Sequence, residues 1–205
     1  MQAMMECADA HRDHPSRPDS LTHHLAQRLA QELRSTSDPA GVEVADLAAE
    51  GFDPRYTLAD RHTYRVGGDF TPDVAAEQER LDRATDLVLV FPVYWWSTPA
   101  LLKGWFDRVF VNGWAFGLDA DGGIVRKLDR LRVHLVPIAG DDAGVYDRHG
   151  YEQAMRTQLE HGIVDFCGAR RGVTTFLHDS EGEDADARTR AVEAAVDAVV
   201  EAIRA

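Results

Sequence analysis

Three consecutive aromatic residues, Tyr94, Trp95 and Trp96, stand in a segment that the sequence pattern predicts to be a tight turn. An apolar run precedes them, and Ser97-Thr98-Pro99 follows as a cap-and-proline signal for the start of a helix. Aromatic side chains left in water at such a turn would forgo about 25 cal/mol for each Å² of apolar area. We therefore expect a flat ligand or a partner subunit to cover them, the alternative being that they pack on the core of their own domain.

Among flat ligands, the isoalloxazine ring of a flavin suits this turn, because it needs an apolar face and backbone N–H groups near its polar edge. A second loop, before the first predicted helix, carries His14 and then Ser20 at the helix N-terminus. Backbone N–H groups and the helix dipole attract phosphate there, so Ser20 and Thr22 are candidates to hold a flavin phosphate. Alternatively, Ser20 is a plain N-cap. The sequence contains neither GxGxxG nor GxxxxGK[ST], so neither an NAD-binding Rossmann domain nor a P-loop is indicated.

A third loop, residues 138–146, is rich in small and turn-forming residues and ends in a tyrosine. Tyr146 and the following His149 are the catalytic candidates, because both could hydrogen-bond charge that develops on a flavin during reduction. Taken by itself, His149 would more often be a surface histidine.

Strands and helices alternate along the chain. The patterns predict strands at residues 2–8, 42–47, 86–91, 133–139 and 173–177, and helices at 20–33, 72–84, 99–111, 151–166 and 184–203. Residues 48–70 are predicted to hold no regular element. This order predicts one α/β domain, residues 1–205, with a parallel sheet between two helix layers, and the strand number favours the flavodoxin-like order 2-1-3-4-5. In such a sheet the three loops above meet at the carboxyl ends of the strands.

The formal net charge of −13 argues against binding of nucleic acid or of anionic lipid. Cys7 and Cys167 lie far apart and have no metal-ligand spacing, so we expect two buried thiols, no metal site and a reducing compartment. No signal-peptide pattern and no apolar run of roughly 20 residues is present. These features predict a soluble, cytoplasmic protein without a membrane span.

The stretch around the aromatic turn, residues 91–117, reads FPVYWWSTPALLKGWFDRVFVNGWAFG. It closely resembles the NAD(P)H:quinone oxidoreductase family, and the similarity covers roughly residues 15–178. The resemblance implies a flavodoxin-like fold and a flavin whose ring is wrapped by Pro92, Val93, Tyr94, Trp95 and Trp96. It implies that the other edge of the ring is approached by Ile138, Gly140, Asp141 and Tyr146. The phosphate-binding loop would be formed by His14, Ser20, Leu21 and Thr22, with His11 an alternative to His14.

Members of the family are typically homodimers with active sites at the subunit interface. The resemblance therefore implies that the interface or the substrate pocket, which includes Trp96, is lined by Trp105, Phe106, Trp114 and Phe116.

Two functions follow as expectations. The first is an NAD(P)H dehydrogenase (quinone), in which FAD, or alternatively FMN, takes a hydride from NAD(P)H at N5 and passes it to a quinone or a similar small acceptor. The second is a flavodoxin-like electron carrier, or a redox-sensing regulatory subunit of a transporter, which an acidic protein would suit. Trp95, Trp96, Trp114 and Phe116 indicate an enclosed pocket, and this favours the enzyme.

Overall fold

The computed structural model describes residues 3–7, 20–36 and 41–205 of the chain. A sheet in the order β2-β1-β3-β6-β7 forms its centre, and neighbouring strands are parallel throughout. Its members are β1 (Ala3–Cys7), β2 (Val42–Asp46), β3 (Asp86–Pro92), β6 (Arg132–Ile138) and β7 (Arg170–Thr174). Counted within this sheet alone, the order is 2-1-3-4-5, as the alternation of strands and helices predicted.

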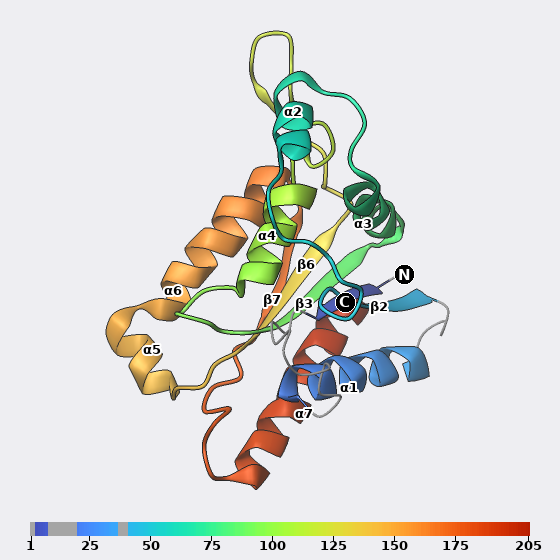
Figure 1. Cartoon of the computed structure of the whole chain (residues 1–205). Coiled ribbons are helices and arrows are strands. Elements are labelled where there is room, and N and C mark those ends of the chain that lie inside the picture. Colours follow the sequence, from blue (N-terminus) through green and yellow to red (C-terminus); the bar gives the residue numbers. More distant parts are fainter. Residues whose placement is uncertain (1–2, 8–19, 37–40) are drawn as a thin grey trace.

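Helices cover both faces of the sheet (Figure 1). One layer consists of α1 (Leu21–Thr36) and α7 (Ala185–Arg204). The other contains α3 (Pro72–Arg83), α4 (Ala100–Val109), α6 (Tyr151–Arg156) and the π-helix η2 (Thr157–Asp165). Successive residues of β3 point into different cores: Leu87 and Leu89 pack in the second layer, Val88 and Val90 in the first. A strand covered on both sides must be apolar throughout, which explains the uninterrupted run before the aromatic turn.

Four elements, α2, α5, β4 and β5, lie where the sequence patterns predicted none. α2 (Leu58–Val66) falls inside the segment expected to be irregular, and a capping box starts it: Thr57 accepts from the Asp60 N–H while the Asp60 carboxylate accepts from Thr57. α5 (Ala143–His149) occupies the predicted third loop, and the Asp142 side chain caps it by accepting from the Val145 N–H. β4 (Phe116–Leu118) and β5 (Ile124–Arg126) form a separate antiparallel hairpin.

The last strand of the sheet lies about three residues earlier than predicted. β6 and β7 change register between Val133 and Leu135, because the Val173 N–H donates to Nδ1 of the buried His134 at 3.2 Å. The imidazole thus accepts the hydrogen bond that the Val173 N–H would donate to a backbone carbonyl in a regular pair of strands. Gly172 makes room for this ring, since a Cβ there would lie 2.5 Å from His134 Nδ1. Beyond β7, Leu177 joins the sheet only through an isolated bridge to Ile138.

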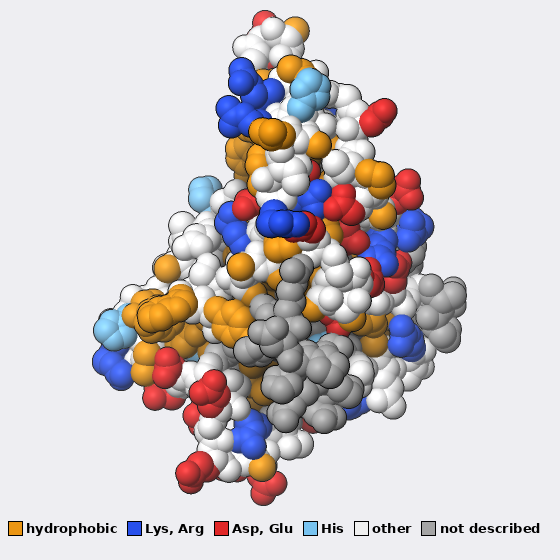
Figure 2. All heavy atoms as spheres, viewed as in Figure 1, with side chains coloured by type: hydrophobic (Ala, Val, Ile, Leu, Met, Phe, Trp, Pro, Cys, Tyr) orange, Lys and Arg blue, Asp and Glu red, His pale blue; other side chains and the backbone are white. Residues whose placement is uncertain are grey.

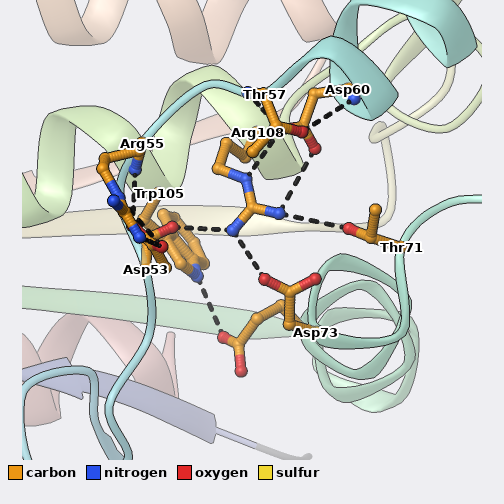
Figure 3. A network of polar contacts seen from close by, with 9 residues as sticks. Asp53, Arg55, Thr57, Asp60, Thr71, Asp73, Trp105 and Arg108 are labelled. Atoms are coloured by element: carbon orange, nitrogen blue, oxygen red, sulfur yellow. Dashed lines mark hydrogen bonds and ion pairs between the residues drawn. The ribbon is translucent and has the colours of Figure 1, made fainter.

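A buried arginine ties α2 to its neighbours (Figure 3). Arg108, near the end of α4, contacts the Asp60 carboxylate at 3.1 and 3.3 Å and the Asp73 carboxylate at 2.6 Å. It also donates to the Thr71 hydroxyl at 3.1 Å and to the Asp53 carbonyl at 2.6 Å. One side chain therefore holds together the segment after β2 and the N-terminal turns of α2 and α3.

Candidate active site

The aromatic turn and the loop after β6 begin side by side at the carboxyl end of the sheet. Pro92 pairs with Ile138 at the end of the β3–β6 ladder, and the Val93 N–H donates to the Ile138 carbonyl at 2.8 Å. Residues 93–99 and 139–142 therefore leave the sheet next to each other. Two of the three loops that the sequence assigned to one site are brought together in this way.

The aromatic turn is a two-residue hairpin. Tyr94 and Ser97 exchange two backbone hydrogen bonds of 3.1 Å, and Trp95 and Trp96 between them have φ angles of 50° and 56°. Two positive φ angles are typical of a type I′ turn, which Asn-Gly fills most easily. For residues with a Cβ, the left-handed region costs roughly 1–2 kcal/mol each. Strain of this kind persists where it serves a site.

The two indoles of the turn have different environments. Trp95 is 86% exposed, whereas Trp96 is partly buried and stacks on Tyr151 with ring centroids 4.4 Å apart. In Figure 2, which shares the view of Figure 1, hydrophobic side chains gather over the region of α5 and the loop before α4. The turn thus offers one free aromatic face beside a ring that is already packed.

Backbone donors are available next to these rings. Within the described part of the chain, no acceptor is found for the backbone N–H groups of Trp95, Trp96, Gly140 and Asp141. They come from the two loops that start side by side. The arrangement can therefore bind a flat group with a polar, hydrogen-bond-accepting edge.

Tyr146 lies at the base of this site, in α5, and is 2% exposed. Burial, followed by the negative charges of Asp141 and Glu152, raises the pKa of Tyr146 to about 12. Its hydroxyl is thus protonated at neutral pH and can donate a hydrogen bond. Its ring meets Tyr151, Phe176 and His178 edge-on.

His149 and His178 differ in their relation to this tyrosine. His149, the histidine that the sequence paired with Tyr146, is exposed and stacks on Tyr151 at 5.2 Å. His178 contacts Tyr146 instead, at 4.8 Å between ring centroids. No sequence pattern pairs His178 with Tyr146, because the two residues lie 32 positions apart and only the path of the chain beyond β7 brings them together.

The N-terminus of α1 is held by a chain of side chains. The Ser20 hydroxyl accepts from the His23 N–H at 3.2 Å, as an N-cap does. The His23 ring lies 2.6 Å from that hydroxyl through Nδ1 and 2.6 Å from Asp46 through Nε2. Thr22 is 4% exposed. His11 and His14, the other candidates for this loop, lie outside the described residues.

Trp114 and Phe116 lie at the opposite end of the sheet from Trp96. They adjoin the hairpin that leads into the first residues of β6, and Trp114 Nε1 donates to Asp82 at the end of α3. The seven residues of β6 separate the two ends by about 20 Å. One chain therefore does not bring Trp96, Trp114 and Phe116 into one pocket.

The position of Trp105 corrects an expectation. It was expected at an interface or in the substrate pocket, but it is 0% exposed and belongs to the domain core. Phe106 is 4% exposed and packs in the same core, but it lines a cavity together with Phe116. Trp105 donates its indole N–H to the buried Glu77 at 2.9 Å. Both side chains of α4 belong to the core on this face of the sheet.

The described residues contain no group of three or more His, Cys, Asp or Glu side chains placed to hold a metal ion. No helix among them has the length and apolar character needed to cross a membrane.

Comparison with known proteins agrees with the geometry. A family model described as a flavodoxin-like fold matches residues 12–202. The uncharacterized NAD(P)H oxidoreductase YcaK of Escherichia coli is 33% identical over 165 residues, which are 80% of this chain and 79% of its own. The ribosyldihydronicotinamide dehydrogenase (quinone) of Rattus norvegicus is 31% identical over 172 residues, 74% and 72% of the two chains. The chain belongs to the NAD(P)H:quinone oxidoreductase family.

Solved structures support the same fold. The NAD(P)H:quinone oxidoreductase from Methanothermobacter marburgensis superposes with a TM-score of 0.82, covering 98% of this chain and 96% of its own at 24% identity. The family therefore rests on the sequence matches, and the structural likeness shows that the flavodoxin-like architecture extends over almost the whole chain.

Proposed function

We propose that this protein is a flavin-dependent NAD(P)H:quinone oxidoreductase, which carries two electrons as a hydride from NAD(P)H to a quinone or a similar acceptor. The observation that carries the proposal is the strained turn of Trp95 and Trp96, with its free indole face and its unused backbone donors beside Gly140 and Asp141. A protein gains no stability from holding two aromatic residues in a left-handed turn and one of them in water. A flat, polar-edged ligand accounts for both features.

The residues of the site fit an isoalloxazine ring, and we propose FAD as the cofactor, with FMN as the alternative. Trp95 would cover an apolar face, and the N–H groups of Trp95, Trp96, Gly140 and Asp141 would bind the polar edge. The bound flavin supplies the hydride chemistry, and the protein supplies binding, orientation and electrostatics. Tyr146, whose pKa is raised to about 12, keeps its proton at neutral pH and would donate a hydrogen bond at the base of the site.

The N-terminus of α1 is proposed to hold the cofactor's phosphate. Ser20, Leu21 and Thr22 place backbone N–H groups at the positive end of the helix dipole. The His23 ring lies beside these donors and contacts Asp46 at 2.6 Å. His14 remains a predicted contact on the preceding loop.

A homodimer would complete the substrate pocket. Within one subunit, Trp96 lies at one end of the sheet, and Trp114 and Phe116 lie at the other. A pocket that contains all three must therefore use two subunits. Exposed apolar side chains near the second end support an interface there, notably Leu58 of α2 at 85% and Ile124 of the hairpin at 51%. We also propose a cytoplasmic location, in keeping with the free, buried thiol of Cys167.

The test is direct. Purified protein should be yellow, and chromatography of the released flavin should identify FAD or FMN. NADH or NADPH should reduce benzoquinone with the parallel double-reciprocal lines of a ping-pong reaction. A colourless protein that binds neither flavin on reconstitution would overturn the proposal. A yellow protein that exchanges single electrons with a partner protein but does not oxidise NAD(P)H would point to a carrier instead.

A further inference from the structure

A cavity, here called the hairpin pocket, lies between α2, α4, η2 and the hairpin of β4 and β5. It has a volume of about 220 Å³, and its apolar walls include Phe106, Phe110, Phe116, Ile163 and Phe166. The Phe116 and Phe166 rings meet edge-on, with centroids 5.0 Å apart. Aromatic and aliphatic walls of this kind suit a flat, apolar body, so the hairpin pocket can hold a molecule of one or two rings.

Two tyrosines add polar groups to the lining. Tyr56 precedes α2, and Tyr64 belongs to it. Burial, followed by the negative charge of Asp60, raises the pKa of Tyr56, so its hydroxyl keeps its proton at neutral pH. A protonated phenol can donate a hydrogen bond, and the carbonyl oxygen of a quinone can accept one.

The carboxylates nearest to the hairpin pocket are already paired. Asp107, which belongs to the lining, accepts from Nζ of Lys103 at 2.6 and 2.8 Å. Asp165, which precedes Phe166, accepts from Nε of Arg171 at 2.8 Å. Each negative charge is therefore offset by a cation in contact with it, which weakens the repulsion of an anion in the pocket.

Arg126 lies at the rim of the hairpin pocket. It is directly opposite Phe116 in the antiparallel β4–β5 ladder, so the two side chains lie on the same face of the hairpin, with Cβ atoms about 5 Å apart. It also lies beside Gly168, where an added Cβ would be 2.6 Å from the Arg126 Cβ. Gly168 follows Cys167, which lines the pocket. The Arg126 side chain is therefore within reach of a substituent on a molecule in the pocket.

The guanidinium of Arg126 is available for binding. It is exposed, and within the described part of the chain no hydrogen-bond or ion-pair partner is found for it. Asp119, in the turn of the hairpin, lies about 10 Å along the strands from Arg126 and accepts from the N–H groups of Asp121 and Gly123. Figure 2 shows Lys and Arg side chains gathered beside α2, at the end of the molecule that carries the hairpin. In a protein with a formal net charge of −13, this end is locally positive.

We propose that Arg126 is a specificity-determining residue that favours acceptors with an anionic substituent, a sulfonate or a carboxylate on an aromatic quinone. This inference rests on the proposed quinone-reductase function and names the class of its acceptor. The apolar walls hold the rings, a phenol hydroxyl binds a carbonyl oxygen, and the guanidinium binds the anion through paired N–H donors. Because the hairpin pocket lies at the end of the sheet away from Trp96, the acceptor in it meets the cofactor of the second subunit in the proposed homodimer.

The experiment compares two naphthoquinones of similar ring size, the neutral menadione and the anionic 1,4-naphthoquinone-2-sulfonate. Equilibrium dialysis gives the Kd of each for the oxidised, flavin-loaded protein, and NADH oxidation gives KM and kcat. An ionic strength of about 0.15 M limits the Debye length to about 8 Å, so the distant acidic charges are screened.

Arg126→Gln should raise the Kd and the KM of the sulfonate about fivefold, the upper end for an exposed ion pair, and should leave kcat unchanged. Menadione has no anionic group, so its Kd and KM should not change. Arg126→Lys should retain most of the affinity for the sulfonate because it keeps the charge. Arg126→Glu should weaken sulfonate binding more than Arg126→Gln does, because it reverses the charge.

Arg190→Gln is the matched control and should change neither quinone, since Arg190 is 71% exposed on α7 in the other helix layer. Gly162→Leu tests the cavity itself. Gly162 lines the hairpin pocket, and a Cβ there would meet only the Thr157 carbonyl oxygen, at 3.4 Å. The larger side chain should weaken binding of both quinones without lowering the free energy of unfolding, because glycine is unfavourable in a helix.

The inference is overturned if Arg126→Gln changes the two quinones equally or changes neither, or if Arg190→Gln has the same effect. Unchanged binding of both quinones in Gly162→Leu would overturn it as well, because the acceptor would then bind elsewhere. A wild type that binds the sulfonate through Arg126 but oxidises no NADH or NADPH with either quinone would refute the proposed function and still support the selectivity of the pocket. The two failures are therefore distinguishable.

Discussion

Replacing the buried Arg108 by methionine should destabilise the protein by about 3 kcal/mol, near the lower end of the 3–5 kcal/mol that follows when one partner of a buried ion pair is removed. The Arg108 and Asp60 side chains are 3% and 5% exposed, so water cannot replace the lost contact. Asp73 is 43% exposed and can be hydrated again, which limits its share. Asp60 also keeps two hydrogen bonds from Thr57, at 2.7 and 2.6 Å, and these limit the loss of unfolding free energy.

Urea denaturation at pH 7 measures the change, and Arg55→Met is the matched control. Arg55 pairs with Asp53 at 2.5 Å in the same region, but its side chain is 85% exposed. Exposed ion pairs contribute about 0–1 kcal/mol, so this variant should stay within about 1 kcal/mol of the wild type. Equal effects of the two substitutions, or a loss below 1 kcal/mol for Arg108→Met, would refute the reasoning.

The difference in unfolding free energy between the wild type and Arg108→Met should depend on pH. Burial tends to raise the pKa of Asp60, but hydrogen bonds from Thr57 and Arg108 outweigh it and hold the pKa below its ordinary value of 3.8. A pKa lowered by folding contributes stability at higher pH, and this contribution is lost as the pH falls through the folded-state value. The difference in unfolding free energy between the wild type and Arg108→Met should therefore become smaller below pH 3.8. A gap that stays constant from pH 7 to pH 3 would mean that lost packing, rather than lost charge pairing, explains the destabilisation.

Three other predictions test the turn, the core and the interface. Trp95→Gly should leave the free energy of unfolding of the flavin-free protein within about 1 kcal/mol, because relief of the left-handed strain offsets the lost ring contact with Trp96. The same change should weaken flavin binding at least about tenfold, measured by fluorescence titration; unchanged affinity would exclude Trp95 from the site. Gly104→Ala should cost about 1–3 kcal/mol or more in denaturant unfolding, because its Cβ would lie 2.2 Å from the Pro54 carbonyl oxygen, and a neutral effect would show that this contact yields easily. Leu58→Asp should shift the mass found by light scattering from dimer to monomer, and an unchanged mass would place the interface elsewhere.

The elements and conformations that the sequence patterns did not predict have identifiable physical causes. α2 was missed although Thr57 and Asp60 form a capping box, because the glycines and prolines around it dominate the local pattern. The π-helix η2 was predicted as part of one helix with α6, since periodicity alone does not separate the two. The aromatic turn was placed correctly, but its conformation was not foreseen, because a type I′ turn is normally signalled by Asn-Gly rather than by two tryptophans.

The sequence by itself determined the alternation of strands and helices, the buried central strand, and the family through residues 91–117, because these are local properties of periodicity and residue type. Only the tertiary structure decided which side chains meet. It buried Trp105 in the core and put Trp114 far from Trp96. It also joined Glu152 to His178 across 26 positions. Such contacts depend on how the carboxyl ends of different strands are ordered in the sheet, and no local pattern records that order.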